Sequence, residues 1–146
     1  MKLTVYLSGE IHTDWRKEIE YVSRQKSLDI RYLSPVTDHD ASDNVGVEIL
    51  GEEEKDFWKD HKAAKINAMR IKKGIEVADI VIVKFGDKYR QWNAAFDVGY
   101  AVAKGKSVIV IHPADFTHAL KEVDAQAMAV THTTEQAIQI LEYLTK

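Results

Sequence analysis

The chain has 146 residues, of which 45% are hydrophobic and 29% charged, a composition typical of one soluble globular domain spanning residues 1–146. The net charge of −3 argues against a general attraction to nucleic acid polymers or anionic membranes. The absence of cysteine excludes disulfides, thiolate metal sites and cysteine nucleophiles. The N-terminal segment turns polar after Leu7, too early for a signal peptide, and no apolar run approaches the roughly 18 residues of a membrane helix, so we expect a cytoplasmic protein.

The first half of the chain predicts two strands, two helices and a long loop. The segments LTVYLS and LDIRYLS have the apolar or alternating pattern of strands, and Trp15, Ile19 and Val22 recur at helical spacing between them. The stretch that follows is polar and rich in Asp, Ser and Asn, and long loops of this kind are often functional. The expected bounds are 3–8 and 28–34 for the strands, 13–26 and 53–77 for the helices, and 35–51 for the loop.

The second half predicts three further strands that alternate with two helices. DIVIVKF is the clearest strand, SVIVIHP is fully apolar and MAVTH is weaker, while helices are expected at 92–104 and 134–146. Strands that are rich in β-branched residues and alternate with helices predict an α/β fold, in which a parallel sheet is covered by helices on both faces. We expect five strands in the order 2-1-3-4-5.

In a sheet of this order, ligands bind beyond the carboxyl ends of the first and third strands, where the strand order reverses. The loops SGEIHTD and GDKYRQWN face that crevice, and Asp97 lies on the helix after the second loop. Asn93 shares a helix face with Asp97 because it lies four residues earlier. A carboxylate in this place can act as a nucleophile, a base or a hydroxyl acceptor. The alternative is an exposed or salt-bridged aspartate without a function.

Several other residues are candidates for the same crevice. Tyr6 is either a core residue or a phenol that hydrogen-bonds the carboxylate of Asp97. The turn at Ser8 and Gly9 offers backbone amides that could hold an anion, and His12 either contacts the substrate or lies on the surface. The expected substrate-binding set is Ser8, Gly9, His12, Gly86, Asp87, Trp92 and Asn93.

The segment DHDASDN suggests a metal cluster, but its spacing fits no standard metal motif and such residues are common in loops. We therefore expect no metal, with a metal-dependent enzyme using residues 39–43 as the alternative. His112 ends a strand beside Pro113, and we expect it at the crevice rim or in a subunit contact.

Five segments together resemble a known family. TVYLSGEIHTDWR, ADIVIVKFG and WNAAFDVGYAVAKGKSVIVI resemble the three main blocks of the nucleoside 2-deoxyribosyltransferase-like superfamily, and SPVTDHDASDNVGVEILGEE and KINAMR resemble its YtoQ branch. The resemblance covers nearly the whole chain and implies a flavodoxin-like three-layer sandwich. It also implies an enzyme that uses no metal or organic cofactor, acts on a nucleoside or nucleotide, and builds its site in a homo-oligomer.

The same resemblance implies catalytic roles for Asp97 and Tyr6. The characterised enzymes cleave the N-glycosidic bond of a 2′-deoxynucleoside or its 5′-monophosphate, with a glutamate attacking the anomeric carbon and a tyrosine positioning it. Asp97 stands where the glutamate would be, with a side chain about 1.5 Å shorter, and Tyr6 stands where the tyrosine would be. Two aspartates of the family pattern are replaced, with Gln91 and Ile71 near their positions. We therefore do not expect the base to be recognised as in the named enzymes.

Two functions are thus open. The first is an N-glycosidic-bond enzyme, a transferase or a hydrolase, in which Asp97 attacks or stabilises the oxocarbenium ion and Tyr6 orients it. The second is a non-catalytic protein that binds a nucleotide or another small metabolite in the same crevice.

Overall fold

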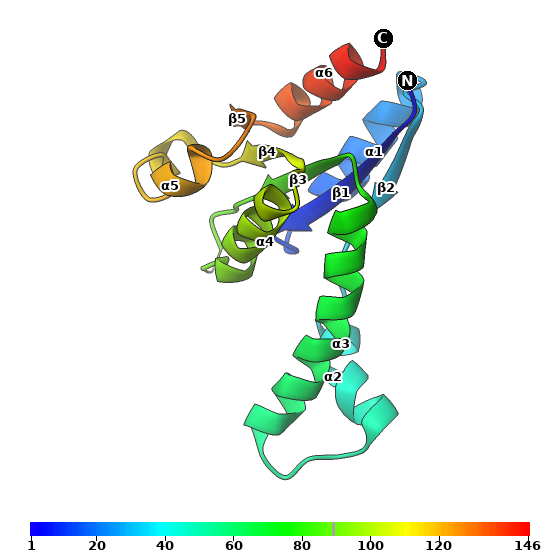
Figure 1. The fold of residues 1–146 in the computed structure, drawn as a ribbon, viewed down its shortest axis with the longest axis vertical. Helices are drawn as coiled ribbons and strands as arrows, with labels where there is room; N and C mark the ends of the chain where they lie inside the picture. Colours follow the sequence, from blue (N-terminus) through cyan, green and yellow to red (C-terminus); the bar gives the residue numbers. More distant parts are fainter. Residues whose placement is uncertain (89) are drawn as a thin grey trace.

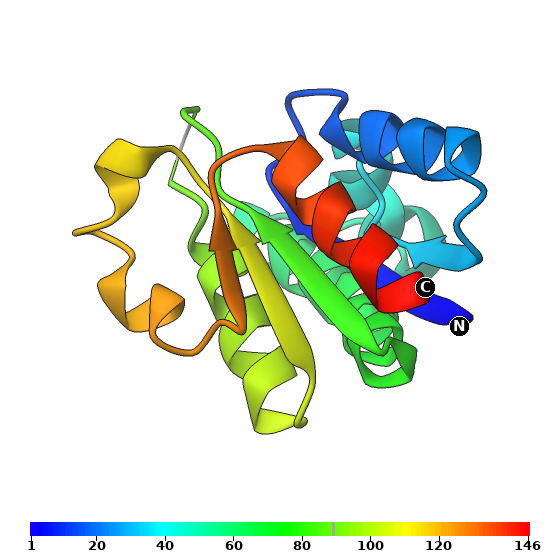
Figure 2. The same cartoon turned by 90° about the horizontal axis from the view of Figure 1, so that it is seen from above.

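The computed structural model of the protein describes residues 1–88 and 90–146. Its centre is a five-stranded parallel sheet with the order β2-β1-β3-β4-β5, which confirms the predicted order. The fold is the predicted α/β sandwich of three layers, with helices on both faces of the sheet (Figure 2). The strands are β1 (Leu3–Gly9), β2 (Ile30–Leu33), β3 (Ile80–Lys84), β4 (Ser107–Ile111) and β5 (Ala129–Thr131).

Alternation along the strands decides which side chains face which helices. Val5 and Leu7 of β1 pack in one apolar cluster with α1 (Trp15–Gln25) and α6 (Thr134–Thr145). Tyr6 packs in the opposite cluster, with α3 (Asp56–Val77) and α4 (Trp92–Ala103). Since Ser8 follows Tyr6 by two residues, it faces the same side, so the carboxyl end of β1 presents both polar side chains to α3 and α4.

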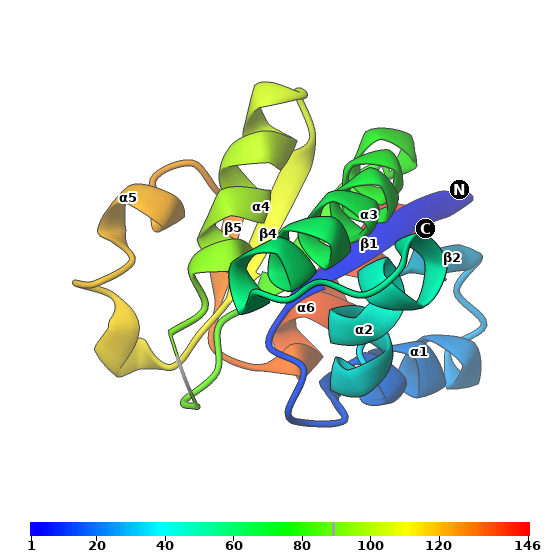
Figure 3. The same ribbon diagram turned by 90° about the horizontal axis from the view of Figure 1, so that it is seen from below.

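The prediction of a loop at residues 35–51 is wrong, because residues 39–50 form the helix α2 (His39–Leu50). The side chain of Asp38 caps this helix by accepting a hydrogen bond from the amide of Ala41 at 2.9 Å. A Cβ atom on Gly46 would lie 2.5 Å from the Cβ of Lys62, so the glycine lets α2 pack closely on α3. The two helices form an arm that projects from the sheet (Figure 1) and lie side by side in the view from below (Figure 3). We call this pair the α2–α3 arm.

The segment between β4 and β5 contains two short helices that the sequence does not predict. These are η1 (Ala114–Phe116) and α5 (Lys121–Asp124). The ring of His112 is fully buried beneath them, with Nδ1 2.7 Å from the carbonyl oxygen of Pro113 and Nε2 3.0 Å from Oδ2 of Asp124. The expectation that His112 lies at the crevice rim or in a subunit contact is therefore wrong. None of the helices in the described residues is long and apolar enough to cross a membrane.

Candidate functional site

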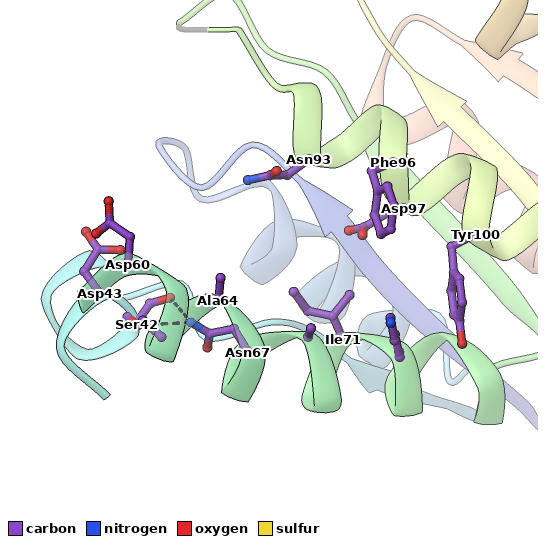
Figure 4. A pocket seen from close by; sticks show the side chains of 13 residues that line it. Ser42, Asp43, Asp60, Ala64, Asn67, Ile71, Asn93, Phe96, Asp97 and Tyr100 are labelled. Carbon is purple, nitrogen blue, oxygen red and sulfur yellow. Dashed lines mark hydrogen bonds between the residues drawn. The ribbon is translucent and has the colours of Figure 1, made fainter. Parts of the chain in front are cut away.

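A cavity with two lobes lies beyond the carboxyl ends of β1 and β3, at the reversal of strand order. The larger lobe, of about 760 Å³, is lined by residues 8–12, residues 90–94 and four residues at or just before the start of α2; we call it the strand lobe. The smaller lobe, of about 380 Å³, lies between α4 and the α2–α3 arm; we call it the arm lobe (Figure 4). The two lobes share the residues Asp43, Ile71, Asn93 and Asp97.

Asp97 lies at the junction of the lobes and is held by a single neutral donor. The residue is only 8% exposed, and the hydroxyl of Ser8 donates a hydrogen bond to its Oδ2 at 2.5 Å. Burial raises the pKa of the Asp97 carboxyl above its usual range, and the hydrogen bond from Ser8 opposes that shift. Among the described residues, no cation forms a salt bridge with this carboxylate. The alternative of an exposed or salt-bridged aspartate is therefore wrong.

Tyr6 lies near Asp97 but does not hold it as expected. Its hydroxyl is buried and has no hydrogen-bond partner in the part of the chain that the structure describes, so the bond to Asp97 is absent and Ser8 provides it instead. The Tyr6 ring packs tightly on α3, where a Cβ atom on Gly74 would come within 2.4 Å of the ring. Burial, together with the negative charge of Asp97, raises the pKa of the Tyr6 phenol.

The turn after β1 is organised around the buried carboxylate of Glu10, which sequence reasoning missed. The carboxylate accepts hydrogen bonds from the amides of His12 at 2.7 Å and Thr13 at 3.1 Å, and from the Thr13 hydroxyl. Burial alone would raise the pKa of Glu10, but these hydrogen bonds and the nearby Lys84 lower it. The amide of Glu10 itself donates to the carbonyl of Lys84. The amides of Glu10, His12 and Thr13 are therefore occupied within the turn and offer no donor to an anion. That the turn at Ser8 and Gly9 holds an anion stays a prediction.

Arg16 of α1 is a second residue that sequence reasoning missed. Its buried guanidinium donates to three backbone carbonyls at the end of β1, those of Leu7 at 3.2 Å, Gly9 at 3.1 Å and Glu10 at 2.6 Å. Burial lowers the pKa of Arg16 to about 10, although the charge of Glu10 opposes the shift. Arg16 thereby fixes the strand end that carries Ser8. In the sequence it is one charged residue among many on an amphipathic helix, which gives no signal for this role.

The structure places the remaining predicted residues in different surroundings. His12 and Trp92 line the strand lobe, and Asn93 lies at the junction. Gly9 also lines the strand lobe, with φ of 104° and no room for a side chain, since a Cβ atom would lie 2.0 Å from the carbonyl oxygen of Lys84. The predicted residues that line neither lobe are Gly86 and Asp87. Tyr89, in the same predicted loop, lies outside the described residues.

The residues of DHDASDN form the start of α2 rather than a metal cluster. Asp38 caps the helix, Asn44 donates to the carbonyl of Asp40, and His39 and Asp43 line the cavity. Over residues 1–88 and 90–146, no group of three or more His, Asp or Glu side chains is arranged to hold a metal ion.

Comparison with known proteins identifies relatives over nearly the whole chain. The family model described as "Nucleoside 2-deoxyribosyltransferase YtoQ" matches residues 6–145. The YtoQ protein of Bacillus subtilis (strain 168) is 45% identical over 144 residues, which cover 99% of this chain and 97% of that protein.

Solved structures with the same fold come from more distant proteins. A conserved protein from Enterococcus faecalis V583 gives a TM-score of 0.66 at 12% identity, covering 99% of both chains. A 2-deoxyribosyltransferase from Bacillus psychrosaccharolyticus gives 0.55 at 17% identity, covering 92% of this chain and 90% of that one. The CMP N-glycosidase BcmB of Clostridium botulinum gives a TM-score of 0.53 at 13% identity, covering 96% of this chain and 98% of that one. At these identities the likeness establishes the fold.

Proposed function

The chain belongs to the family described as nucleoside 2-deoxyribosyltransferase YtoQ, and on this basis we propose that it cleaves the N-glycosidic bond of a nucleoside or nucleotide with Asp97 as the nucleophile. Proteins with the same fold include a 2-deoxyribosyltransferase and a CMP N-glycosidase, which supports this class of reaction.

The observation that carries the proposal is the environment of Asp97. A carboxylate that attacks a sugar must be shielded from bulk water and must keep one oxygen free. Asp97 is buried, Ser8 holds its Oδ2, and the residue lies where two lobes meet. A sugar at this junction would have its base in one lobe and its other end in the second lobe.

In the proposed reaction, Oδ1 of Asp97 forms an ester with the anomeric carbon as the C–N bond breaks. The bonding electrons pass to the base nitrogen, which takes a proton from solvent. Water or a second base then attacks the anomeric carbon, and the carboxylate leaves with the electrons of the ester bond. The attacking water or base loses its proton to solvent. The two steps retain the configuration of the sugar, as carboxylate nucleophiles do in glycosidases.

The experiment is a panel of nucleosides, 2′-deoxynucleosides and their 5′-monophosphates, with free base measured by chromatography. We expect base release that falls roughly 10³-fold or more in Asp97→Asn, as loss of a nucleophile does. Asp115→Asn is the matched control, because Asp115 is an exposed aspartate that lines neither lobe, so base release should be unchanged. If no member of the panel releases base while a control enzyme does, the proposal is wrong. Binding without turnover would then favour the non-catalytic alternative.

We also propose that the protein is a homo-oligomer in which a second copy covers the outer face of α4. Trp92 is 72% exposed and Phe96 64% exposed, and with the exposed Gly99 and Ala103 they form an apolar stripe along one helix face. Trp92 lines the strand lobe and Phe96 the arm lobe, so a second copy here would border the cavity. Sedimentation should show an oligomer that Phe96→Glu dissociates, and a monomeric parent protein would contradict this.

A further inference from the structure

The two lobes of the cavity differ in the charges that line them. His12, His39 and Arg90 line the strand lobe alone, whereas Asp60 and Lys72 line the arm lobe alone. The strand lobe also includes the acid Glu10, but hydrogen bonds from His12 and Thr13 and the nearby Lys84 already engage that carboxylate. Asp43 and Asp97 line both lobes and do not distinguish them. Of the two lobes, the strand lobe therefore suits an anion better.

Three separate segments bring these basic groups to one lobe. His12 comes from the turn after β1 and His39 from the first residue of α2, and their rings stack with centroids 5.6 Å apart at 29°. Arg90 lies just before α4, with its guanidinium carbon 5.8 Å from the centre of the Trp92 ring. An arginine binds a phosphate through a planar fork of donors, and imidazoles add donors of their own. This combination suits a phosphate group better than a neutral hydroxyl.

We propose that the strand lobe binds the 5′-phosphate of the substrate, so that the substrate is a nucleoside 5′-monophosphate rather than a free nucleoside. The inference rests on the proposed function, in which the sugar lies beside Asp97. In a nucleotide the base is attached to C1′ and the phosphate to C5′, at opposite ends of the sugar. A sugar at the junction thus directs these two groups into different lobes.

The arm lobe is the poorer place for the phosphate and the better one for the base. A phosphate there would meet the carboxylate of Asp60, which does not line the strand lobe. The same lobe offers flat apolar surface from Ala64 and Phe96, and polar groups that can pair with the edge of a base (Figure 4). The assignment therefore places the base between α4 and the α2–α3 arm, with the phosphate at His12, His39 and Arg90.

The test compares each nucleoside with its own 5′-monophosphate by calorimetry and by kcat/KM, using four bases and inorganic phosphate as further probes. We expect the monophosphate to bind at least about tenfold more tightly, and Arg90→Ala to reduce that ratio by roughly 10- to 100-fold, as loss of hydrogen bonds to a charged group does. Lys72→Ala is the matched control, since it removes one cation from the other lobe. It should change both affinities by a similar factor and leave the ratio intact.

The outcomes separate this inference from the proposed function. Equal affinity for nucleosides and monophosphates overturns the phosphate site, even if free base is released. A preference that Lys72→Ala abolishes and Arg90→Ala leaves unchanged also overturns it. A preference that depends on Arg90, in a protein that releases no base from any monophosphate, supports the phosphate site and contradicts the proposed function.

Discussion

The unpaired hydroxyl of Tyr6 makes Tyr6→Phe a substitution that should stabilise the protein. Within residues 1–88 and 90–146 the buried hydroxyl has no hydrogen-bond partner, and such a group costs about 1–3 kcal/mol of unfolding free energy. Phenylalanine keeps the ring that packs on Gly74 and removes only the oxygen. We therefore expect a gain of about 1–3 kcal/mol, with Tm rising by roughly 3 °C for each kcal/mol in a chain of this length.

The measurement is urea denaturation of the parent protein and of two variants. Tyr32→Phe is the matched control, because the Tyr32 hydroxyl lies 2.7 Å from the hydroxyl of Ser23 and its loss should cost about 0.5–1.5 kcal/mol. The two substitutions remove the same atom and should have opposite signs. A similar loss in both variants would refute the reasoning, since it would mean that the Tyr6 hydroxyl has a partner in solution.

Three further predictions concern Asp97 and its surroundings. Ser8→Ala removes a hydrogen bond that lowers the pKa of Asp97, so the acidic limb of the plot of kcat/KM against pH should move to higher pH. A limb that does not move would mean that a group other than Asp97 titrates there. Because burial raises the pKa of Asp97 in the folded state, its contribution to stability is present below the unfolded pKa of about 4 and is lost as pH rises through the folded pKa. Asp97→Asn should therefore be more stable than the parent at pH 8, with the difference vanishing near pH 3, and a less stable variant at pH 8 would contradict this. Arg16→Met should lower the unfolding free energy, measured by urea denaturation, by on the order of 3 kcal/mol, because three backbone carbonyls lose a charged donor. A loss below about 1 kcal/mol would show that water replaces the guanidinium as the donor.

The sheet was predictable because its three central strands β1, β3 and β4 are buried on both faces and their apolar runs leave few alternatives. The helix α2 was not, because it packs mainly on α3 and buries only Gly46 and Val47. Because α2 is largely exposed, it has little apolar periodicity, and its residues look like those of a loop. The packing of Gly46 on Lys62 joins parts of the chain that no local pattern connects.

The position of the site was also predictable, but its hydrogen bonds were not. Topology places the end of β1 and the start of α4 at one crevice, and this brings Ser8 and Asp97 together. Tyr6 and Ser8 face the same side and differ by one repeat along the strand, about 6.7 Å. Which of the two reaches Asp97 depends on how deeply α4 packs against the sheet. That depth follows from three-dimensional packing and leaves no trace in the spacing of residues.

The contact between Ser8 and Asp97 also explains why a neutral partner suits the proposed reaction. A lysine or arginine paired with Asp97 would stabilise the ionised carboxylate, lower its basicity and occupy the oxygen that must attack. The Ser8 hydroxyl instead holds Oδ2 with one bond, and burial keeps the carboxylate more basic than a solvated aspartate. A more basic carboxylate is a better nucleophile, and the cost is a folded state that is less stable at neutral pH. The features that make Asp97 unfavourable for folding are thus those that a carboxylate nucleophile requires.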